Sequence, residues 1–436
     1  MSERLLFHST RGAASATLEQ AIAAGLAPDG GLYVPEALPR LTIEAFDGAE
    51  TLPEIASVLL APFFAGSSLA GALPEICAEA LNFPTPLSRL SQRRQAYLLE
   101  LFHGPTAAFK DIGARFLAAC LTRLRRGATQ ALTILVATSG DTGAAVAAAL
   151  HRQPGVHVVI LYPDGRVSPR QAHQLGCFGD NVQALRVDGS FDDCQRMVKA
   201  MLNDSELQAQ LPLSSANSIS LGRLLPQMSY YAQAALTIWR EHGTEAGFIV
   251  PTGNLGNALA CVWAREMGLP IGYIHLACNA NATLPDYFGG ADYTPQPTVA
   301  TLANAMDVGA PSNFERLRWT FPHDNELRSE LSASSTNDAE IRQTLVRHAK
   351  DEGEIVCPHT ATALRVLDEL ADDGTPRVIA ATAHPAKFET VLEPLGISPE
   401  VPGSLAAMLY RSASAEALAA NEDALREWLL AQVEKA

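Results

Sequence analysis

The feature that most constrains the fold of this chain is the alternation of short apolar runs with helical segments. Strands that alternate with helices normally pair in parallel, so this pattern predicts an α/β fold with a parallel sheet covered by helices on both faces. With 436 residues, 47% of them hydrophobic, the chain can bury a large core and exceeds one typical domain. The strand-like runs are Ala131–Ala137, Val156–Tyr162, Val182–Val187, Phe248–Val250, Gly272–Ala277 and Val378–Ala381.

The segments outside these runs suggest three units. The N-terminal unit is small, with a helix expected near Ala13–Ala24 and a turn rich in Gly and Pro after it. Asn281–Thr344 lacks clean strand patterning and is expected to form a partly helical lobe over the site. Ala415–Val433 has the pattern of an amphipathic helix that is expected to pack on the body, with docking on another subunit as the alternative. The expected boundaries are 1–90, 91–410 and 411–436.

Lys110 stands directly behind a turn and a run of small residues. The turn at 104–105 breaks the chain, Thr106 is a residue type that caps helices, and Ala107–Arg126 has a helical pattern. In the first turn of a helix the dipole disfavours a cation, and burial also lowers the pKa of an amine. A lysine with a lowered pKa suits a Schiff base. On position alone an exposed lysine is the simpler interpretation, and two later loops decide against it.

Each of these two loops follows a strand and leads into a helix, an arrangement whose free backbone N–H groups can hold an anion. The first, Thr138–Gly143, matches neither the spaced glycines of a dinucleotide site nor the nucleotide phosphate loop, so a nucleotide is not predicted. The second, Pro251–Asn257, contains Gly253 and Gly256 and no acidic side chain, which makes it the better phosphate cradle. Taken alone, either loop also fits an ordinary tight turn.

A lysine, a loop of hydroxyl and acid side chains and a separate phosphate loop together point to pyridoxal phosphate. This cofactor must be linked through an imine, held at its phosphate and given a hydrogen-bond partner at its pyridine nitrogen. Thr382 is the candidate for that partner, because it ends the strand Val378–Ala381 at the sheet edge where α/β proteins usually bind ligands.

At this point the sequence resembles the threonine synthase family of the bacterial and fungal type, in the tryptophan-synthase-β-like group of pyridoxal-phosphate enzymes. The resemblance spans nearly the whole chain, and so many motifs in one order are far more specific than any one of them. The motifs are Ser9–Gly12, Gly25–Glu36, Phe102–Asp111, Ser139–Gly143, Val187–Cys194, Asn217–Ile219 with Arg223, Met306–Asp307, Ser312–Leu317, Pro358–Ala361 and Thr382–Phe388.

The resemblance implies a fold type II enzyme, with parallel-sheet three-layer domains and a small N-terminal domain. It implies a phosphate-eliminating lyase that converts O-phospho-L-homoserine and water into L-threonine and phosphate, the last step of threonine biosynthesis. Such an enzyme is expected to be cytoplasmic and a monomer or homodimer. Lys110 would hold the cofactor, and Thr382 would contact its pyridine nitrogen. The matching phosphate loop is Gly253, Asn254, Leu255, Gly256 and Asn257.

The same motifs supply candidates for binding the substrate. A loop of hydroxyl and acid side chains is expected at the substrate carboxylate or at the ring hydroxyl of the cofactor. An arginine fork suits a phosphomonoester dianion, and two arginines lie in the matched segments. For the second of them, Arg316, an ion pair within its own helix is the alternative. The candidates are Ser139, Asp141, Thr142, Asn217, Arg223 and Arg316.

Three positions depart from the family pattern. Leu255 replaces the more usual Phe, which is a tolerable apolar exchange. Asn257 stands where Asp is general, and its amide can donate as well as accept, so the phosphate contact should survive with altered electrostatics. Cys357 also replaces an expected Asp, and the sequence gives no physical account of the consequence.

Composition narrows the partners. The net charge of -15 is spread over the chain without a basic patch, which argues against nucleic acid and anionic membrane surfaces. Seven scattered cysteines without a Cys-x-x-Cys pair indicate reduced, mostly buried thiols in a cytosolic protein. We expect no signal peptide, no membrane span and no metal site, and His359 is interpreted as a helix cap.

Two other functions stay open. One is another fold type II enzyme, such as an amino-acid dehydratase or a β-replacing synthase. These usually carry Asn at the position of Asp141 and lack the N-terminal unit. The other is a degenerate relative that binds phosphorylated amino acids without turnover. Loss of the imine lysine would mark it, whereas Lys110 is present here.

Overall fold

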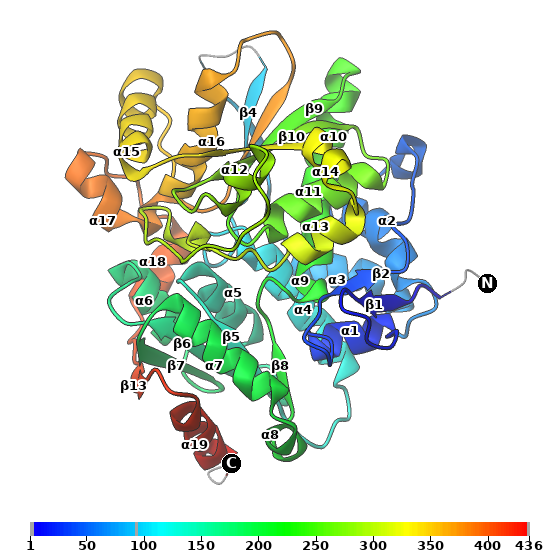
Figure 1. Cartoon of the computed structure of the whole chain (residues 1–436), viewed down its shortest axis with the longest axis vertical. Coiled ribbons are helices and arrows are strands. Elements are labelled where there is room, and N and C mark those ends of the chain that lie inside the picture. Colours follow the sequence, from blue (N-terminus) through cyan, green and yellow to red (C-terminus); the bar gives the residue numbers. More distant parts are fainter. Residues whose placement is uncertain (1–3, 92–94, 434–436) are drawn as a thin grey trace.

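Two sheets carry the predicted α/β pattern, and they lie in separate halves of the molecule (Figure 1). The computed structural model describes residues 4–91 and 95–433. In the six-stranded sheet all neighbours are parallel except β3 and β4. Its order is β11 (Leu331–Ser335), β10 (Ile271–Cys278), β9 (Ala246–Pro251), β12 (Arg377–Ala381), β4 (Ala96–Glu100) and β3 (Leu87–Arg89).

The five-stranded sheet is parallel throughout. Its order is β13 (Glu416–Ala419), β7 (Val182–Asp188), β6 (Val156–Pro163), β5 (Leu132–Ala137) and β8 (Leu213–Ser215). Together the two sheets contain all six predicted strands, with ends shifted by at most two residues. Long apolar runs are recognisable in sequence because strands buried on both faces need apolar side chains throughout.

Each sheet has helices on both faces, as the alternation of side chains along a strand requires. In β9, Phe248 and Val250 belong to the core cluster with α10 (Met228–His242) and α11 (Gly256–Glu266). Ile249, between them, belongs to the opposite cluster with α16 (Pro358–Glu369). The five-stranded sheet, the lower one in Figure 1, repeats this arrangement. The helices α4 (Lys110–Leu124) and α5 (Asp141–Leu150) lie on one face, and α7 (Phe191–Asn203) and α19 (Glu422–Val433) lie on the other.

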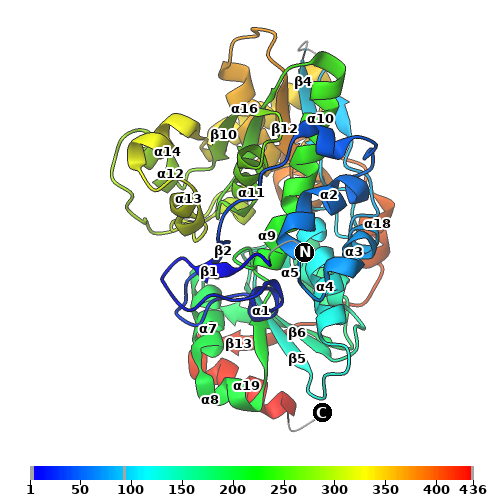
Figure 2. The ribbon, with the colours of Figure 1, turned by 90° about the vertical axis from the view of Figure 1, so that its right-hand side faces the viewer.

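The N-terminal segment runs along the side of the molecule between the two halves (Figure 2). The strands β1 (Phe7–Ser9) and β2 (Tyr33–Pro35) pair antiparallel. The helix α1 spans only Leu18–Ala24, because Thr17 forms a capping box at its start and Gly25 ends it in the left-handed region at φ 71°. The expected start at residue 13 was therefore wrong. The helices α2 (Leu52–Phe64) and α3 (Leu73–Ala80) pack beside α10 and α4.

Two further expectations need correction. The tail does not form one helix over Ala415–Val433, since its first part is the strand β13, which extends the lower sheet, and only α19 is helical. Leu425 and Leu429 of α19 are buried, so the predicted packing on the body is confirmed. The lobe from residue 281 to 344 is partly helical but also contains β11. Its sequence, Leu-Ser-Ala-Ser-Ser, has no apolar pattern because it is an edge strand.

None of the helices in the described part of the chain has the length and apolarity that a membrane crossing requires.

Candidate active site

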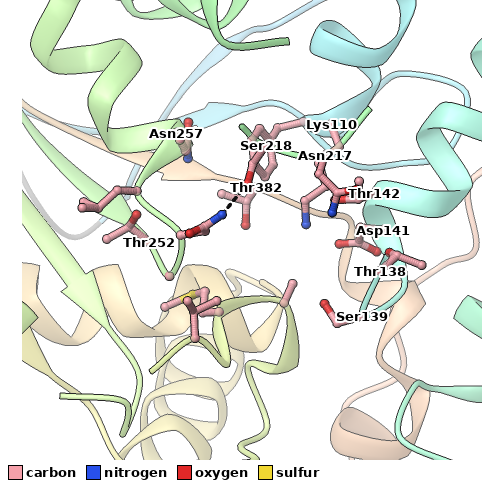
Figure 3. A pocket seen from close by; sticks show the side chains of 18 of the residues that line it. Lys110, Thr138, Ser139, Asp141, Thr142, Asn217, Ser218, Thr252, Asn257 and Thr382 are labelled. Carbon is pink, nitrogen blue, oxygen red and sulfur yellow. Dashed lines mark hydrogen bonds between the residues drawn. The ribbon is translucent and has the colours of Figure 1, made fainter. Parts of the chain in front are cut away.

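One cleft, enclosing about 870 Å³ including its open mouth, lies at the carboxyl ends of strands from both sheets (Figure 3). The segments that follow β4, β5, β8, β9 and β12 all contribute to its wall, which is the usual ligand position in parallel α/β sheets. Arg316 is the one predicted site residue that does not line it. The others are Lys110, Ser139, Asp141, Thr142, Asn217, Arg223, Gly253, Asn254, Leu255, Gly256, Asn257 and Thr382.

The loop before Lys110 is held by the segment after β12. The N–H of Phe109 donates to the carbonyl of Thr382 at 2.8 Å, and the N–H of His384 donates to the carbonyl of Ala107 at 3.0 Å. Ala107 has a left-handed backbone at φ 56°, so the helix begins at Lys110 and not at residue 107 as expected. Thr106 does not cap it, and its N–H and hydroxyl instead donate to the carboxylate of Asp111.

The two lysines of the matched motifs differ in what their amines contact. Burial lowers the pKa of Lys110 to about 8, with Arg223 and Lys387 acting in the same direction and Asp141 opposing them. Within the described residues the Nζ of Lys110 has no hydrogen-bond partner. Lys387 is fully buried, and its Nζ donates to Asp141 Oδ1 and to the carbonyl of Thr106, each at 2.8 Å. Only the amine of Lys110 is therefore free to react in this cleft.

The loop between β9 and α11 has the features of a phosphate site. Leu255 is left-handed at φ 62°, and α11 starts at the next residue, so its unpaired N–H groups face the loop. The side-chain carbonyl of Asn257 accepts hydrogen bonds from the hydroxyls of Tyr230 and Tyr231. Its Nδ2 and the hydroxyl of Thr252 are buried and have no partner among the described residues. Orphaned donors at a helix N-terminus fit a bound phosphate.

Asn254 supports this loop from within. Its Nδ2 donates to the hydroxyl of Ser218 at 2.6 Å, and its Oδ1 accepts from the N–H of Ser312. Asn313 adds a donor to the carbonyl of Asn254 at 2.9 Å. Both ends of the Asn254 amide are thus used in fixing the loop to two other segments.

Gly253 gives a prediction, because a side chain has no room there. A Cβ at Gly253 would stand 2.6 Å from the Cα of Met306 and 2.7 Å from its carbonyl oxygen. We expect Gly253→Ala to push the loop away from Met306 and to weaken cofactor affinity about tenfold or more, since overpacking costs roughly 1–3 kcal/mol. Absorbance titration of the cofactor-free protein measures this. Gly256→Ala is the matched control, because the nearest atom to its Cβ would be 3.5 Å away. Equal effects of the two substitutions would contradict the prediction.

The loop after β5 is held together by the hydroxyl of Thr138 and leads into the acid Asp141. Thr138 Oγ1 accepts from the N–H groups of Gly140 and Gly143, each at 3.0 Å, and α5 starts at Asp141. Asp141 is buried, and its Oδ1 accepts from Lys387 and from Gln171 Nε2. Burial would raise the pKa of Asp141, but Lys387 and Lys110 hold it below its usual range. An ionised carboxylate repels the carboxylate of a substrate, which argues against Asp141 as its binding partner.

The remaining predicted residues differ in what they can offer a ligand. Asn217 lines the cleft, but its Nδ2 donates to the carbonyl of Ala137 at 2.8 Å and its Oδ1 accepts from the same residue's N–H. Arg223 is 2% exposed and donates from Nη1 to the carbonyl of Ala216 at 2.7 Å. Its Nε is buried without a partner among the described residues, and the residue itself contributes to the cleft wall.

Arg316 is fully buried away from the cleft. Its guanidinium donates to the carbonyls of Tyr33 and Ile219 and to Asn313 Oδ1, at 2.7–3.0 Å. These acceptors join the N-terminal segment to the wall of the site. The position does not support a contact with the substrate phosphate, and we leave Arg316 out of the proposed site. The alternative of an ion pair with an acid of its own helix is not observed either.

The sequence did not single out every cleft residue. Ser218, Thr252 and His359 line the cleft without having been assigned to it. His359 Nε2 accepts from the N–H of Ala305 at 3.0 Å, and burial lowers the pKa of His359 to about 4, so the ring is neutral and carries its proton on Nδ1. The residue that caps α16 is instead Cys357, whose sulfur accepts from the N–H of Thr360. An Asp at position 357 would fill the same capping role.

Comparison with known proteins agrees with these features. A family model described as "Pyridoxal-phosphate dependent enzyme" matches residues 79–383. Models described as "Threonine synthase N terminus" and "Threonine synthase, C-terminal" match residues 6–81 and 360–429. The chain is therefore a pyridoxal-phosphate-dependent enzyme of fold type II.

Comparison with individual sequences and solved structures identifies the family within this class of enzymes. The chain is 38% identical to threonine synthase of Haemophilus influenzae, covering 89% of this chain and 91% of the relative, and 37% identical to that of Escherichia coli, covering 94% and 96%. The solved structure of threonine synthase from Escherichia coli has a TM-score of 0.91 at 36% identity, covering 98% of this chain and 100% of the other. A pyridoxal-phosphate-bound threonine synthase from Brucella melitensis has a TM-score of 0.89 at 34% identity, covering 99% and 100%. The chain belongs to the threonine synthase family.

Proposed function

We propose that this enzyme converts O-phospho-L-homoserine and water into L-threonine and phosphate. The observation that carries the proposal is the Lys110 amine, which has no hydrogen-bond partner among the described residues and stands in a cleft with two separate places for phosphate. One is the start of α11, with the orphaned donors of Thr252 and Asn257. The other is Arg223, a residue of the cleft wall whose buried Nε has no hydrogen-bond partner among the described residues. A phosphorylated cofactor and a phosphorylated substrate need two such places.

The cleft residues fit pyridoxal phosphate, and each has a proposed role. Lys110 would hold it covalently, and the loop from Gly253 to Asn257 would bind its phosphate. Thr382 would face the pyridine nitrogen, and Asp141 the ring hydroxyl. When bound, the cofactor supplies an electron sink for the carbon next to the substrate's amino group.

The residues of the chain carry the remaining steps. Once the substrate amine has displaced it, the Lys110 amine moves protons at Cα and Cβ of the substrate. Its pKa of about 8 lies near neutrality, where proton transfer in both directions is efficient. Arg223 binds the phosphate that leaves from Cγ, and water adds at Cβ. Ser139 and Thr142, in the loop and first turn of α5, are proposed to bind the substrate carboxylate.

A product assay tests the reaction against its alternatives. The purified enzyme is given O-phosphohomoserine, threonine or serine, and both inorganic phosphate and ammonia are measured. We expect phosphate and threonine in equal amounts from the first substrate. Ammonia as the main product would indicate a dehydratase, and binding without either product would indicate a degenerate relative.

Thr382→Val tests the contact at the pyridine nitrogen. Thr382 is 6% exposed and its hydroxyl makes no hydrogen bond within the described residues, so an isosteric valine should leave the fold intact. We expect turnover to fall more than cofactor loading, because the hydrogen bond from this hydroxyl to the pyridine nitrogen would adjust how strongly the ring withdraws electrons. One hydrogen bond is worth about 0.5–1.5 kcal/mol. Steady-state kinetics and the cofactor content of the purified variant measure both. Unchanged kinetics with full loading would mean that another group faces the nitrogen.

The domain boundaries, the cellular location, the oligomeric state and the kinds of partner are also part of this proposal. We propose units at 1–90, 91–410 and 411–436; the family models for the N-terminal and catalytic parts meet near residue 80, about ten residues before the first of these boundaries. We also propose a cytoplasmic monomer or homodimer, without nucleic-acid or membrane partners, in keeping with the net charge of -15.

A further inference from the structure

Lys387 is a buried cation that the proposed reaction does not use. It lies in the short helix η6 (Pro385–Lys387), just after β12 of the six-stranded sheet, and is 0% exposed. Its Nζ donates to Asp141 Oδ1, from the lower half of the molecule, and to the carbonyl of Thr106, in the loop that leads to Lys110. One ammonium group therefore joins both halves at the edge of the cleft.

The charges around this pair are few. Besides Asp141 and Lys387, the groups that act on Lys110 include Arg223, the thiol of Cys357 and His359. His359 faces Asp141, and the lowered pKa of about 4 leaves it neutral near pH 7. Asp111 and His384 are the other titratable groups near Lys387. Burial raises the pKa of Asp111 to about 6 and lowers that of His384 to about 4. Near pH 7 the ions next to Lys110 are thus one carboxylate and two cations.

An ionised carboxylate beside an amine stabilises the protonated amine, which is not a nucleophile. Asp141 would have this effect on Lys110 if it stood alone. In the structure its charge is balanced by Lys387 at 2.8 Å, so the pKa of Lys110 is set chiefly by burial and stays low.

We propose that Lys387 is a positioning residue: its ammonium group neutralises Asp141 and so keeps a larger share of Lys110 in the uncharged, nucleophilic form while the acid remains at the cleft. The inference rests on the proposed function of Lys110. It also gives the two motif lysines different tasks, since the first reacts and the second holds a charge in place.

The direction of the effect follows from electrostatics. Without the cation at 387, the positive group with the next-largest electrostatic effect on Asp141 is the Lys110 nitrogen. That nitrogen, in its link to the cofactor, should then hold its proton to a higher pH. An opposite charge within about 4–6 Å typically moves a pKa by about 1–3 units, a factor of ten or more in the protonation ratio.

The test is a pH titration of the visible absorbance band of the cofactor-loaded enzyme. We expect Lys387→Met to raise the titration midpoint by about one unit or more. The double variant Asp141→Asn with Lys387→Met has no unpaired charge, so its midpoint should return close to that of the wild type. If Lys387→Met does not fold, Lys387→Gln, which keeps a donor but not the charge, carries the test.

The outcomes separate this inference from a structural role and from the proposed function. A purely structural ion pair would lower the melting temperature of the single variant without moving its midpoint, and that result would overturn the inference. An equal shift in the single and double variants would also overturn it. Borohydride reduction followed by peptide mapping checks the premise. Cofactor fixed outside Lys110 would contradict the proposed function, whereas cofactor at Lys110 with an unmoved midpoint would contradict only the role of Lys387.

Discussion

Lys110→Ala is expected to remove the visible absorbance of the bound cofactor and nearly all turnover. In the proposed mechanism the variant loses both the covalent link and the group that moves protons, and a positioned acid–base group alone is worth about 10²–10⁴-fold in rate. The absorbance spectrum and steady-state phosphate release measure the two losses. Because the phosphate loop is untouched, some non-covalent cofactor binding should persist, and equilibrium dialysis would detect it.

Peptide mapping supplies the control for this result. Borohydride reduction of the wild type should fix the cofactor on the peptide that contains Lys110. The matched lysine is Lys387, which lies in another family motif but is buried with two partners. Labelling at Lys387 would overturn the assignment and, with it, the proposed chemistry.

The second large effect is expected for the substrate phosphate. Arg223→Ala should lose about 1.5–3 kcal/mol of apparent binding for O-phosphohomoserine, the range of a charge-assisted hydrogen bond. An unphosphorylated amino acid that binds the same cofactor should lose almost nothing. Spectral titration of the loaded enzyme with each ligand gives both values.

Arg316→Ala is the matched control for Arg223. Both arginines are buried and lie in family motifs, but Arg316 donates to acceptors that hold the N-terminal segment against the site wall. Its loss should lower the melting temperature and weaken both ligands alike. Equal losses for both ligands in Arg223→Ala would show that Arg223 also supports the fold, and its assignment would be withdrawn.

The sequence predicted those parts of the molecule that depend on neighbours in the chain. The strands are continuous apolar runs, and the loop from Pro251 to Asn257 combines its glycines with a helix start, so both are visible locally. The start of α4 was missed because Ala107 adopts a left-handed backbone that its residue type does not suggest. Contacts with Ala383 and His384, far along the chain, hold it there.

Side-chain roles were harder to predict when they depend on distant partners. Arg223 and Arg316 look alike in sequence, yet only one lies on the cleft wall, and the acceptors of the other come from residues 33, 219 and 313. Lys387 was visible as part of a motif, but its pairing with Asp141 requires both sheets to be in place. His359 was predicted to cap the helix because it lies near the helix start. In the structure the N-cap residue of α16 is Cys357.

The position of β12 has a consequence for the order in which the site forms during synthesis. This strand is the last of the six-stranded sheet in sequence but lies in its interior, between β9 and β4. When synthesis has reached the end of α16, Lys110, Arg223 and the loops after β5 and β9 have already been made. The loop before Lys110, however, still lacks Thr382 and Ala383, the residues that hold it in place. Pairing across such a separation is slow to form. Cofactor capture is therefore a late event, which the nascent chain cannot complete until β12, ending at Ala381 of 436 residues, has left the ribosome and entered the sheet.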